Sequence, residues 1–204
     1  MTPELTALLA EAAAALRAGE VVAFPTDTVY GLAVDPDRPG ATARLFALKG
    51  RPDTVALPVL VGDRAQAQTL AGPDGLPPLA RRLADRFWPG PLTMVVPRAA
   101  DLDWDLGGDD ATIGIREPAD PLARALCLAV GPLATTSANL HGDEPLTTAA
   151  AVRAAFPVGI AVVVDGGPCA GQPSTVVDAT GAEPVCLRAG GVPWEGILAI
   201  VADR

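Results

Sequence analysis

Residues that commonly build metal and disulfide sites are scarce in this chain. Its 204 residues include three cysteines and one histidine. Cys127, Cys169 and Cys186 are odd in number and lack CxxC spacing, which argues against most zinc and disulfide frameworks. We therefore interpret the cysteines as buried, small apolar thiols of a protein in a reducing cytosol.

Positive charge and long apolar runs are also in short supply. Fifteen basic residues stand against 24 acidic ones, for a net charge of -9. This balance argues against broad affinity for nucleic acid or for anionic membranes. The first 20 residues carry no basic leader, and no uninterrupted apolar run reaches about 20 residues. We expect a soluble cytoplasmic protein with weak or no nucleic-acid binding and no membrane insertion.

Common nucleotide and calcium motifs are missing as well. Neither GxxxxGKS/T nor GxGxxG occurs. The stretch "DLDWDLGGDD" begins like a calcium loop, but Leu106 stands where Gly is needed and Thr112 where Glu is needed, so we interpret it as a solvated acidic loop. A catalytic Ser-His-acid device would have to use His141, which lies in a Gly- and acid-rich turn and is better interpreted as a surface residue.

Apolar residues make up 50% of the chain but aromatic ones only 4%, which predicts an aliphatic core large enough for one domain spanning residues 1–204. A helix is expected to begin at Thr2-Pro3-Glu4 and to end before Gly19. Further helices are expected at 41–49, 63–71, 78–88, 121–129, 148–156 and 194–202. Strands are expected at 20–24, 58–61, 92–96, 112–116, 133–136, 160–164, 175–179 and 184–188. This order predicts an α/β fold with a mixed sheet covered by helices on both faces.

Four residue types occur once each, as Lys49, Asn139, Tyr30 and His141. All four fall in three short segments, "FPTDTVYGL", "LKGRP" and "TTSANLHG". Each segment follows an expected strand or helix and contains Gly or Pro, which is typical of ligand-binding loops on α/β scaffolds. The grouping therefore indicates a ligand site.

Basic side chains at two places in the chain suit anionic ligands. Lys49 offers a compact ammonium and Arg51 a planar fork, so together they suit a polyphosphate. The alternative is that both complement the negative end of the preceding helix. Arg116 shares one side of its expected strand with Thr112, where it would bind a carboxylate or form an ion pair with an acid of the chain. The hydroxyl-rich stretches "TTSAN" and "PSTVVD" suit a small polar ligand, or else cap turns.

Taken together, these segments resemble the Sua5/YrdC/TsaC family, the L-threonylcarbamoyladenylate synthases. The likeness runs, in family order, through "VVAFPTDTVYGLAVDP", "LKGRP", "WPGPLTMVV", "TIGIREP", "LATTSANLHG", "STVVD" and "CLRAGG". The resemblance implies a single YrdC-like domain with a twisted mixed sheet and a large concave site. It also implies a nucleotidyltransferase that converts L-threonine, bicarbonate and ATP to threonylcarbamoyl-AMP and pyrophosphate. That product would serve t6A formation at tRNA position 37, through a TsaD-type partner complex.

The resemblance also implies roles for individual residues. The threonine-binding positions of the family match Thr28, Arg116, Ser137 and Ser174. Its ATP-binding positions match Lys49, Arg51, Thr112, Asn139, Thr147 and Arg188. Lys49 and Arg51 are the expected catalytic pair, stabilising charge on the leaving pyrophosphate, with Mg2+ bridging phosphate oxygens and no metal site on the protein itself. We expect Lys49→Ala and Arg51→Ala to lose pyrophosphate release without losing the fold.

Some features depart from the family pattern or leave alternatives open. Further ATP and threonine contacts of the family would fall near Leu57 and Gly62, which do not match it, so neither contact is assigned. We expect no second Sua5-type domain after residue 204, and the stretch 98–111 is a candidate lid. The alternatives are an RNA-binding module, a YciO-like paralogue with different chemistry, and a relative of the hydrogenase-maturation enzymes, whose further domains are not expected in this chain.

Overall fold

The structure is a computed structural model that describes residues 2–50, 54–140 and 142–202. Its helices are α1 (Pro3–Arg17), α2 (Ala41–Lys49), α3 (Arg64–Leu70), α4 (Pro78–Phe87), α5 (Pro121–Val130), α6 (Ala149–Ala155) and α7 (Trp194–Ala202). Its strands are β1 (Val22–Phe24), β2 (Gly31–Val34), β3 (Val59–Leu60), β4 (Leu92–Pro97), β5 (Thr112–Arg116), β6 (Leu133–Ser137), β7 (Val162–Val163), β8 (Thr175–Asp178) and β9 (Val185–Arg188). No helix among these residues is long and apolar enough to span a bilayer.

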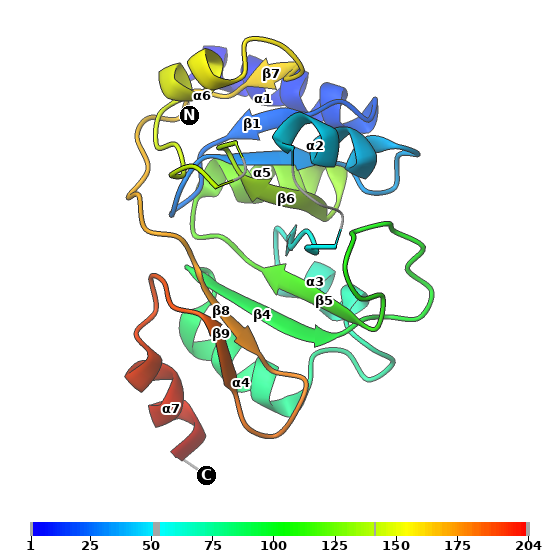
Figure 1. Cartoon of the computed structure of the whole chain (residues 1–204), viewed down its shortest axis with the longest axis vertical. Helices are drawn as coiled ribbons and strands as arrows, with labels where there is room; N and C mark the ends of the chain where they lie inside the picture. Colours follow the sequence, from blue (N-terminus) through cyan, green and yellow to red (C-terminus); the bar gives the residue numbers. More distant parts are fainter. Residues whose placement is uncertain (1, 51–53, 141, 203–204) are drawn as a thin grey trace.

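The strands form one mixed sheet in the order β7-β1-β2-β6-β3-β5-β4-β8-β9 (Figure 1). Strand β1 is parallel to β7, β3 to β5 and β4 to β8, and the other neighbouring pairs are antiparallel. The sheet is twisted, and helices cover both of its faces (Figure 1). The predicted α/β class with a mixed, helix-flanked sheet is therefore confirmed.

Successive side chains at β1 pack into two different buried clusters, one on each face of the sheet. Val21 and Ala23 belong to one buried cluster, whereas Val22 and Phe24 belong to another, because successive side chains of a strand point to opposite faces. Helices α1 and α5 supply the second cluster, and helices α2, α3, α4, α6 and α7 supply the first. The core is mainly aliphatic on both sides of the sheet, as the composition predicts, although several aromatic side chains lie within it. Of the three cysteines expected to be buried, Cys127 is buried, but Cys169 is half-buried and Cys186 is exposed.

Local signals account for most element boundaries. Thr2 caps α1, with its hydroxyl accepting a hydrogen bond from the amide of Leu5, and Gly50 ends α2 in a left-handed conformation. Each expected helix and strand lies at its predicted position to within a few residues. Strand β2 was not predicted: all four of its residues are buried, but they follow directly on the polar segment "PTDTVY", which we had interpreted as a ligand loop.

A narrow seam divides the sheet. Strand β3 has only two residues, and it joins β6 on one side to β5 on the other. The upper part of the sheet in Figure 1 holds β7, β1, β2 and β6, and the lower part holds β5, β4, β8 and β9. The turn between β1 and β2 and the ends of β5 and β6 approach one another at this seam.

The acidic stretch 98–111 is fastened to the body of the protein. Arg98 donates to the carbonyls of Leu102 (2.9 Å) and Trp104 (2.5 Å). The indole of Trp104 donates to Asp37 (2.6 Å). The described residues contain no group of three or more His, Cys, Asp or Glu side chains placed to hold a metal ion. The stretch contributes no residue to the cavity described next, so its role as a lid stays a prediction.

Candidate active site

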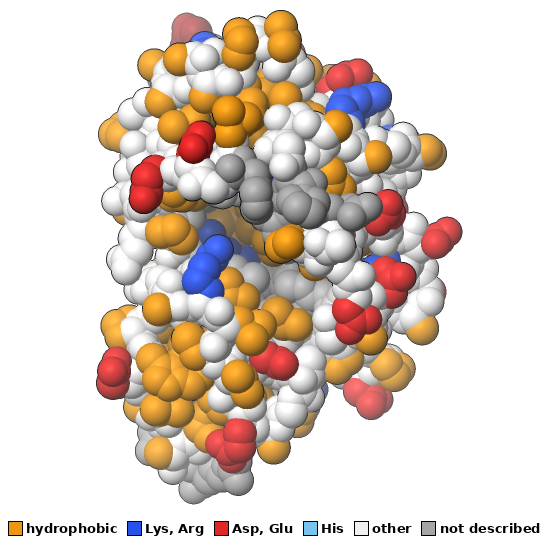
Figure 2. Space-filling view, in the orientation of Figure 1, with side chains coloured by type: hydrophobic (Ala, Val, Ile, Leu, Met, Phe, Trp, Pro, Cys, Tyr) orange, Lys and Arg blue, Asp and Glu red, His pale blue; other side chains and the backbone are white. Residues whose placement is uncertain are grey.

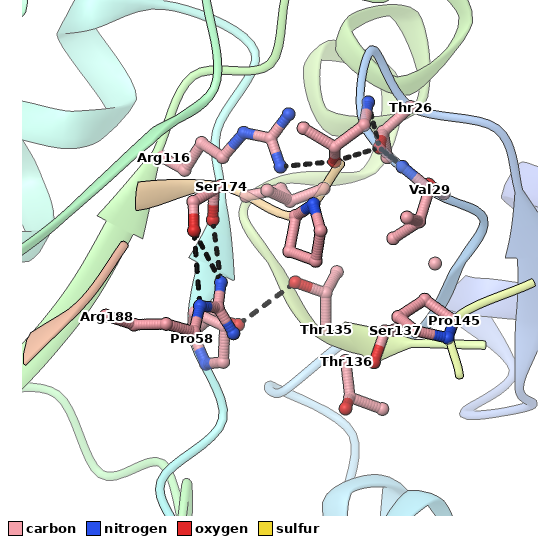
Figure 3. A pocket seen from close by; sticks show the side chains of 14 residues that line it. Thr26, Val29, Pro58, Arg116, Thr135, Thr136, Ser137, Pro145, Ser174 and Arg188 are labelled. Atoms are coloured by element: carbon pink, nitrogen blue, oxygen red, sulfur yellow. Dashed lines mark hydrogen bonds between the residues drawn. The ribbon is translucent and has the colours of Figure 1, made fainter. Parts of the chain in front are cut away.

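A cavity of about 170 Å³ opens at the seam of the sheet. Its lining comes from the β1–β2 turn, β3, the end of β5, β6, the segment before β8, and β9. The lining residues are Thr26, Thr28, Val29, Gly31, Pro58, Leu60, Arg116, Thr135, Thr136, Ser137, Pro145, Pro173, Ser174 and Arg188 (Figure 3). In the space-filling view, Lys or Arg side chains, coloured blue, lie in the hollow between the upper and lower parts of the molecule (Figure 2).

Arg116 is the buried cation of this cavity. Its side chain is 7% exposed and is held at three nitrogens: Nε donates to the carbonyl of Gly90 (3.0 Å), Nη1 to the Thr28 hydroxyl (2.9 Å) and Nη2 to Asp27 Oδ1 (2.5 Å). Burial lowers the pKa of Arg116 from its ordinary value, and the charge of Asp27 opposes that shift. An arginine has five N–H donors, and three are matched within the described chain, so two remain for a ligand.

Asp27 is a residue of the site that the sequence did not reveal. Its Oδ1 accepts from Arg116 and from the backbone amide of Ala119 (3.0 Å), so it ties the β1–β2 turn to the segment after β5. It is not a lining residue of the cavity. The signal available in the sequence was a lone acid between two threonines in "PTDTVY", which does not say which cation it meets.

Ser174 and Arg188 form the opposite wall. Arg188 donates through Nε (3.2 Å) and Nη2 (2.8 Å) to the carbonyl of Ser174, and through Nη2 to its hydroxyl (3.1 Å). The Ser174 hydroxyl also lies 2.9 Å from that of Thr93, which is buried on β4. Burial lowers the pKa of Arg188. Gly190 permits this arrangement, since a Cβ there would meet the carbonyl oxygen of Pro173 at 2.4 Å.

Lys49 is buried at the end of α2, beneath the turn that follows β6. The three N–H groups of its ammonium are shared among four oxygens: the carbonyl (2.6 Å) and hydroxyl (3.3 Å) of Ser137 and the carbonyl (3.1 Å) and side-chain oxygen (2.9 Å) of Asn139. The Ser137 hydroxyl in turn donates to Asn139 Oδ1 (2.6 Å). The lone lysine therefore organises the Ser-x-Asn turn, an arrangement that neither alternative drawn from the sequence included.

The predicted site residues divide into three groups. Thr28, Arg116, Ser137, Ser174 and Arg188 line the cavity, and Lys49 and Asn139 join it through their hydrogen bonds with Ser137. Thr112 and Thr147 are not lining residues, although Thr112 shares the face of β5 that bears Arg116. Arg51 and His141 lie outside the described residues.

The two unassigned positions also have definite places. Leu57 is 1% exposed and packs in the hydrophobic core. Gly62 is not a lining residue, and a Cβ on it would meet Leu128 of α5 at 2.6 Å. Neither position supplies a polar contact to the cavity in this structure.

Comparison with known proteins identifies the family. A family model described as telomere recombination, for the Sua5/YciO/YrdC domain, matches residues 14–190. This chain belongs to the Sua5/YciO/YrdC family. A Chromohalobacter salexigens protein named threonylcarbamoyl-AMP synthase is 45% identical over 177 residues, which cover 83% of this chain and 91% of that protein.

Two solved structures of the family are similar in fold. The crystal structure of Pyrococcus abyssi Sua5 with L-threonine has a TM-score of 0.91 at 37% identity, covering all of this chain. The present chain spans 59% of that longer protein. The crystal structure of Escherichia coli YciO has a TM-score of 0.86 at 26% identity, covering 96% of this chain and 95% of YciO. This Sua5/YciO/YrdC chain thus resembles both branches in fold and is closer in sequence to the Sua5 structure.

Proposed function

We propose that this chain is a threonylcarbamoyl-AMP synthase, which makes threonylcarbamoyl-AMP and pyrophosphate from L-threonine, bicarbonate and ATP. The observation that carries the proposal is the buried guanidinium of Arg116 with two N–H donors left for a ligand, in a cavity lined by hydroxyls. A carboxylate matches two such donors with parallel hydrogen bonds. The names of the relatives and the likeness to threonine-bound Sua5 support the same assignment.

In the proposed complex, threonine occupies the cavity between the two walls. Arg116 binds its carboxylate, and the hydroxyls of Thr28, Ser137 and Ser174 surround its polar groups. The volume of about 170 Å³ suits an amino acid. Desolvation inside such a cavity strengthens each charge-assisted hydrogen bond.

ATP is proposed to lie along the same seam, held by Lys49, Arg51, Thr112, Asn139, Thr147 and Arg188. Thr112 and Arg116 lie on one face of β5, and the rise of a strand puts their Cα atoms about 13 Å apart, which suits an elongated second substrate beside threonine. Lys49 bonds one residue proposed to hold threonine, Ser137, and one proposed to hold ATP, Asn139. Its ammonium therefore lies near the point where the two substrates would meet.

The chemistry begins at the threonine amine. The neutral amine adds to the carbon of bicarbonate with loss of water, or to CO2 with loss of a proton from nitrogen, and an oxygen of the resulting carbamate attacks the α-phosphorus of ATP. The bond from the α-phosphorus to the bridging oxygen breaks, and pyrophosphate leaves with that oxygen. Because the described residues that line the cavity include no His, Cys, Asp or Glu, we propose that catalysis comes from positioning and charge neutralisation, with Lys49 and Arg51 supplying positive charge near the leaving group.

Mg2+ is proposed to enter with ATP. The described residues include no carboxylate cluster to hold the ion by itself, so the phosphate oxygens and water would supply its ligands. Bound in this way, Mg2+ would reduce the charge on the phosphates. We further propose that the product passes to a TsaD-type complex, which transfers the threonylcarbamoyl group to tRNA.

A pyrophosphate-release assay tests the function. The proposal predicts release only when threonine, bicarbonate and ATP are all present, and a product with the mass of threonylcarbamoyl-AMP. Release that does not depend on threonine would instead favour a YciO-like paralogue with other chemistry. Absence of release together with salt-sensitive tRNA binding would favour an RNA-binding module. The net charge of -9 weighs against that second outcome.

A further inference from the structure

The β1–β2 turn contains a second threonine, Thr26, two residues before Thr28, and it is buried. We propose that Thr26 is a positioning residue that fixes the hydroxyl of Thr28 as a hydrogen-bond acceptor toward the cavity. The Thr28 hydroxyl then selects a ligand with an N–H group at that point, which is the amino group of threonine. This inference rests on the proposed function for the identity of the ligand, and on the structure alone for the direction of the hydrogen bonds.

The direction follows from counting donors. A hydroxyl has one proton to donate and two lone pairs to accept with. The Thr26 hydroxyl donates its proton to the carbonyl of Val29 at 2.7 Å. It also lies 2.9 Å from the Thr28 hydroxyl, and since its own proton is assigned to the Val29 carbonyl, we assign Thr28 as the donor in that pair. The geometry alone would have allowed either direction.

The other end of the chain of hydrogen bonds is equally fixed. Arg116 Nη1 donates to the Thr28 hydroxyl at 2.9 Å, and a guanidinium cannot accept. The bonds therefore run in one direction, from Arg116 to Thr28, then to Thr26 and finally to the carbonyl of Val29. The Thr28 hydroxyl thus donates its proton to Thr26 and accepts from Arg116 with one lone pair, so its second lone pair can accept a hydrogen bond from a ligand in the cavity.

The Thr26 side chain cannot easily rotate to reverse the hydrogen bond that it accepts from Thr28. Its second lone pair is shared by the backbone amides of Thr28 (3.2 Å) and Val29 (3.3 Å), so the backbone of the turn holds the hydroxyl in place. The side chain is part of a fixed loop and not a free rotor. The backbone contacts of Thr26 thus set the direction in which the Thr28 hydroxyl donates, and this leaves an acceptor lone pair of Thr28 facing the cavity.

The consequence concerns ligand choice. An amine or an ammonium presents N–H to the lone pair of Thr28, whereas a carboxylate oxygen at the same point would face a lone pair and be repelled. The carboxylate is thereby directed to the guanidinium of Arg116, and the amine to Thr28. Thr28 and Arg116 are in contact, so the two ends of an α-amino acid find their matching partners side by side.

Matched substitutions can separate this role from simple packing. Thr26→Val keeps the shape but removes the hydroxyl, and Thr26→Ser restores it. Thr135→Val is the control, because Thr135 is another buried threonine of the cavity lining whose hydroxyl donates to a backbone carbonyl, that of Pro58 (3.1 Å), but does not contact Thr28. The ligands are L-threonine and 3-hydroxybutanoate, which keeps the carboxylate and hydroxyl but lacks the amino group.

Binding is measured for both ligands by NMR titration. In Thr26→Val the Thr28 proton is free to turn into the cavity, so threonine affinity falls about tenfold while 3-hydroxybutanoate affinity changes less than about twofold. Thr26→Ser returns the threonine affinity to within about threefold of the original. Thr135→Val leaves the ratio of the two affinities unchanged. An equal loss for both ligands in Thr26→Val, or no loss of threonine affinity, overturns the proposal.

A neutron crystal structure of the ligand-free protein tests the direction without any substrate. The expected result is a hydrogen on the Thr28 oxygen that points to Thr26, and a hydrogen on Thr28 pointing into the cavity would overturn the proposal. If the hydrogen lies as expected but the unsubstituted protein binds no threonine, the proposed function fails while the orientation of the hydroxyl stands. The two failures are therefore distinguishable.

Discussion

The carboxylate of Asp27 lies 2.5 Å from the guanidinium of Arg116, although the two residues are 89 positions apart in the chain. Their side chains are 17% and 7% exposed. The pair connects the β1–β2 turn to the end of β5, and the carboxylate compensates the buried charge of the Arg116 guanidinium. Because Asp27 also accepts the Ala119 amide, it fixes Arg116 relative to both segments.

Substitution of Asp27 should therefore uncouple the two segments. Asp27→Ala leaves Arg116 without its counter-charge, so we expect the free energy of unfolding to fall by about 3 kcal/mol and the KM for threonine to rise. Asp27→Asn keeps an oxygen acceptor and should lose less, about 1–2 kcal/mol. Urea denaturation measures both.

Asp110→Ala is the control for loss of an acid that pairs with a buried arginine. Asp110 pairs with Arg98 at 3.2 Å, but its side chain is 90% exposed, so the expected change is at most about 1 kcal/mol. Equal effects of Asp27→Ala and Asp110→Ala would contradict the structural role given to Asp27.

Gly190 should be intolerant of any side chain. A Cβ at this position would lie 2.4 Å from Ser174 C and 2.5 Å from Ser174 O, so Gly190→Ala must push the β8 entry away from β9. We expect a loss of about 1–3 kcal/mol in unfolding free energy and a marked fall in activity, because Ser174 and Arg188 lose their alignment.

Gly181→Ala is the matched control, since the nearest atom to its Cβ would be the Glu183 carbonyl oxygen at 4.0 Å. Thermal unfolding and pyrophosphate release of the two variants can be compared directly. Unchanged activity in Gly190→Ala would show that the placement of Ser174 by β9 is unimportant for the reaction.

Lys49 should matter for both stability and chemistry. Lys49→Met keeps the aliphatic stem but removes the donor shared by Ser137 and Asn139, so the variant should remain folded with a free energy of unfolding lower by about 1–3 kcal/mol. Pyrophosphate release should fall about a hundredfold, because the Ser-x-Asn turn and the charge near the leaving group are both affected.

Arg44 provides a cation on the same helix for comparison. It is exposed on α2 and pairs with Glu20 at 3.7 Å. Arg44→Met should leave pyrophosphate release within about twofold and the free energy of unfolding within about 1 kcal/mol. A similar loss of activity in both variants would point to a general effect of charge on α2 and not to the position of the Lys49 ammonium.

Glu117 should make stability depend on pH. Its carboxyl group is buried, and burial raises its pKa above the usual 4.5 despite Arg124 at 3.7 Å and Arg64 at 4.0 Å. From about pH 4.5 up to the raised value, the folded state binds more protons than the unfolded state, so the contribution of Glu117 to stability is lost as the pH rises.

Glu117→Gln removes this titration. The free energy of unfolding of the variant, relative to the unsubstituted protein, should be constant below pH 4.5 and increase as the pH rises above it. Glu20→Gln, at a side chain 49% exposed, controls for removal of one negative charge. A relative stability of Glu117→Gln that falls with rising pH would show that its attraction to the two arginines outweighs burial.

The sequence predicted most helices and strands because the residues that begin and end them lie within or next to each element. Thr2 and Pro3 begin α1, and Gly50 ends α2, and each signal lies within a few residues of the boundary it sets. Strand β2 escaped notice because its four buried residues are flanked by polar ones, and its pairing with β1 and β6 is a property of the assembled sheet.

The site was only partly predictable for a related reason. The resemblance to a family indicated Thr28, Arg116, Ser137, Ser174 and Arg188, all of which line the cavity. The residues that hold them in place were not found, because their partners are distant in the chain: Asp27 meets Arg116, and Thr93 meets Ser174 across 81 positions. The spacing of residues along a sequence does not show which distant side chains meet in the folded protein.

Strand β3, in the middle of the sheet, has only two residues, and the cavity lies beside it. A ligand that touches Arg116 on one side and Ser137 on the other would act as a brace across this seam. Part of its binding energy would then stabilise the packing of the two parts of the sheet against each other. Substrate binding would thus support the protein where the fewest strand residues join those two parts.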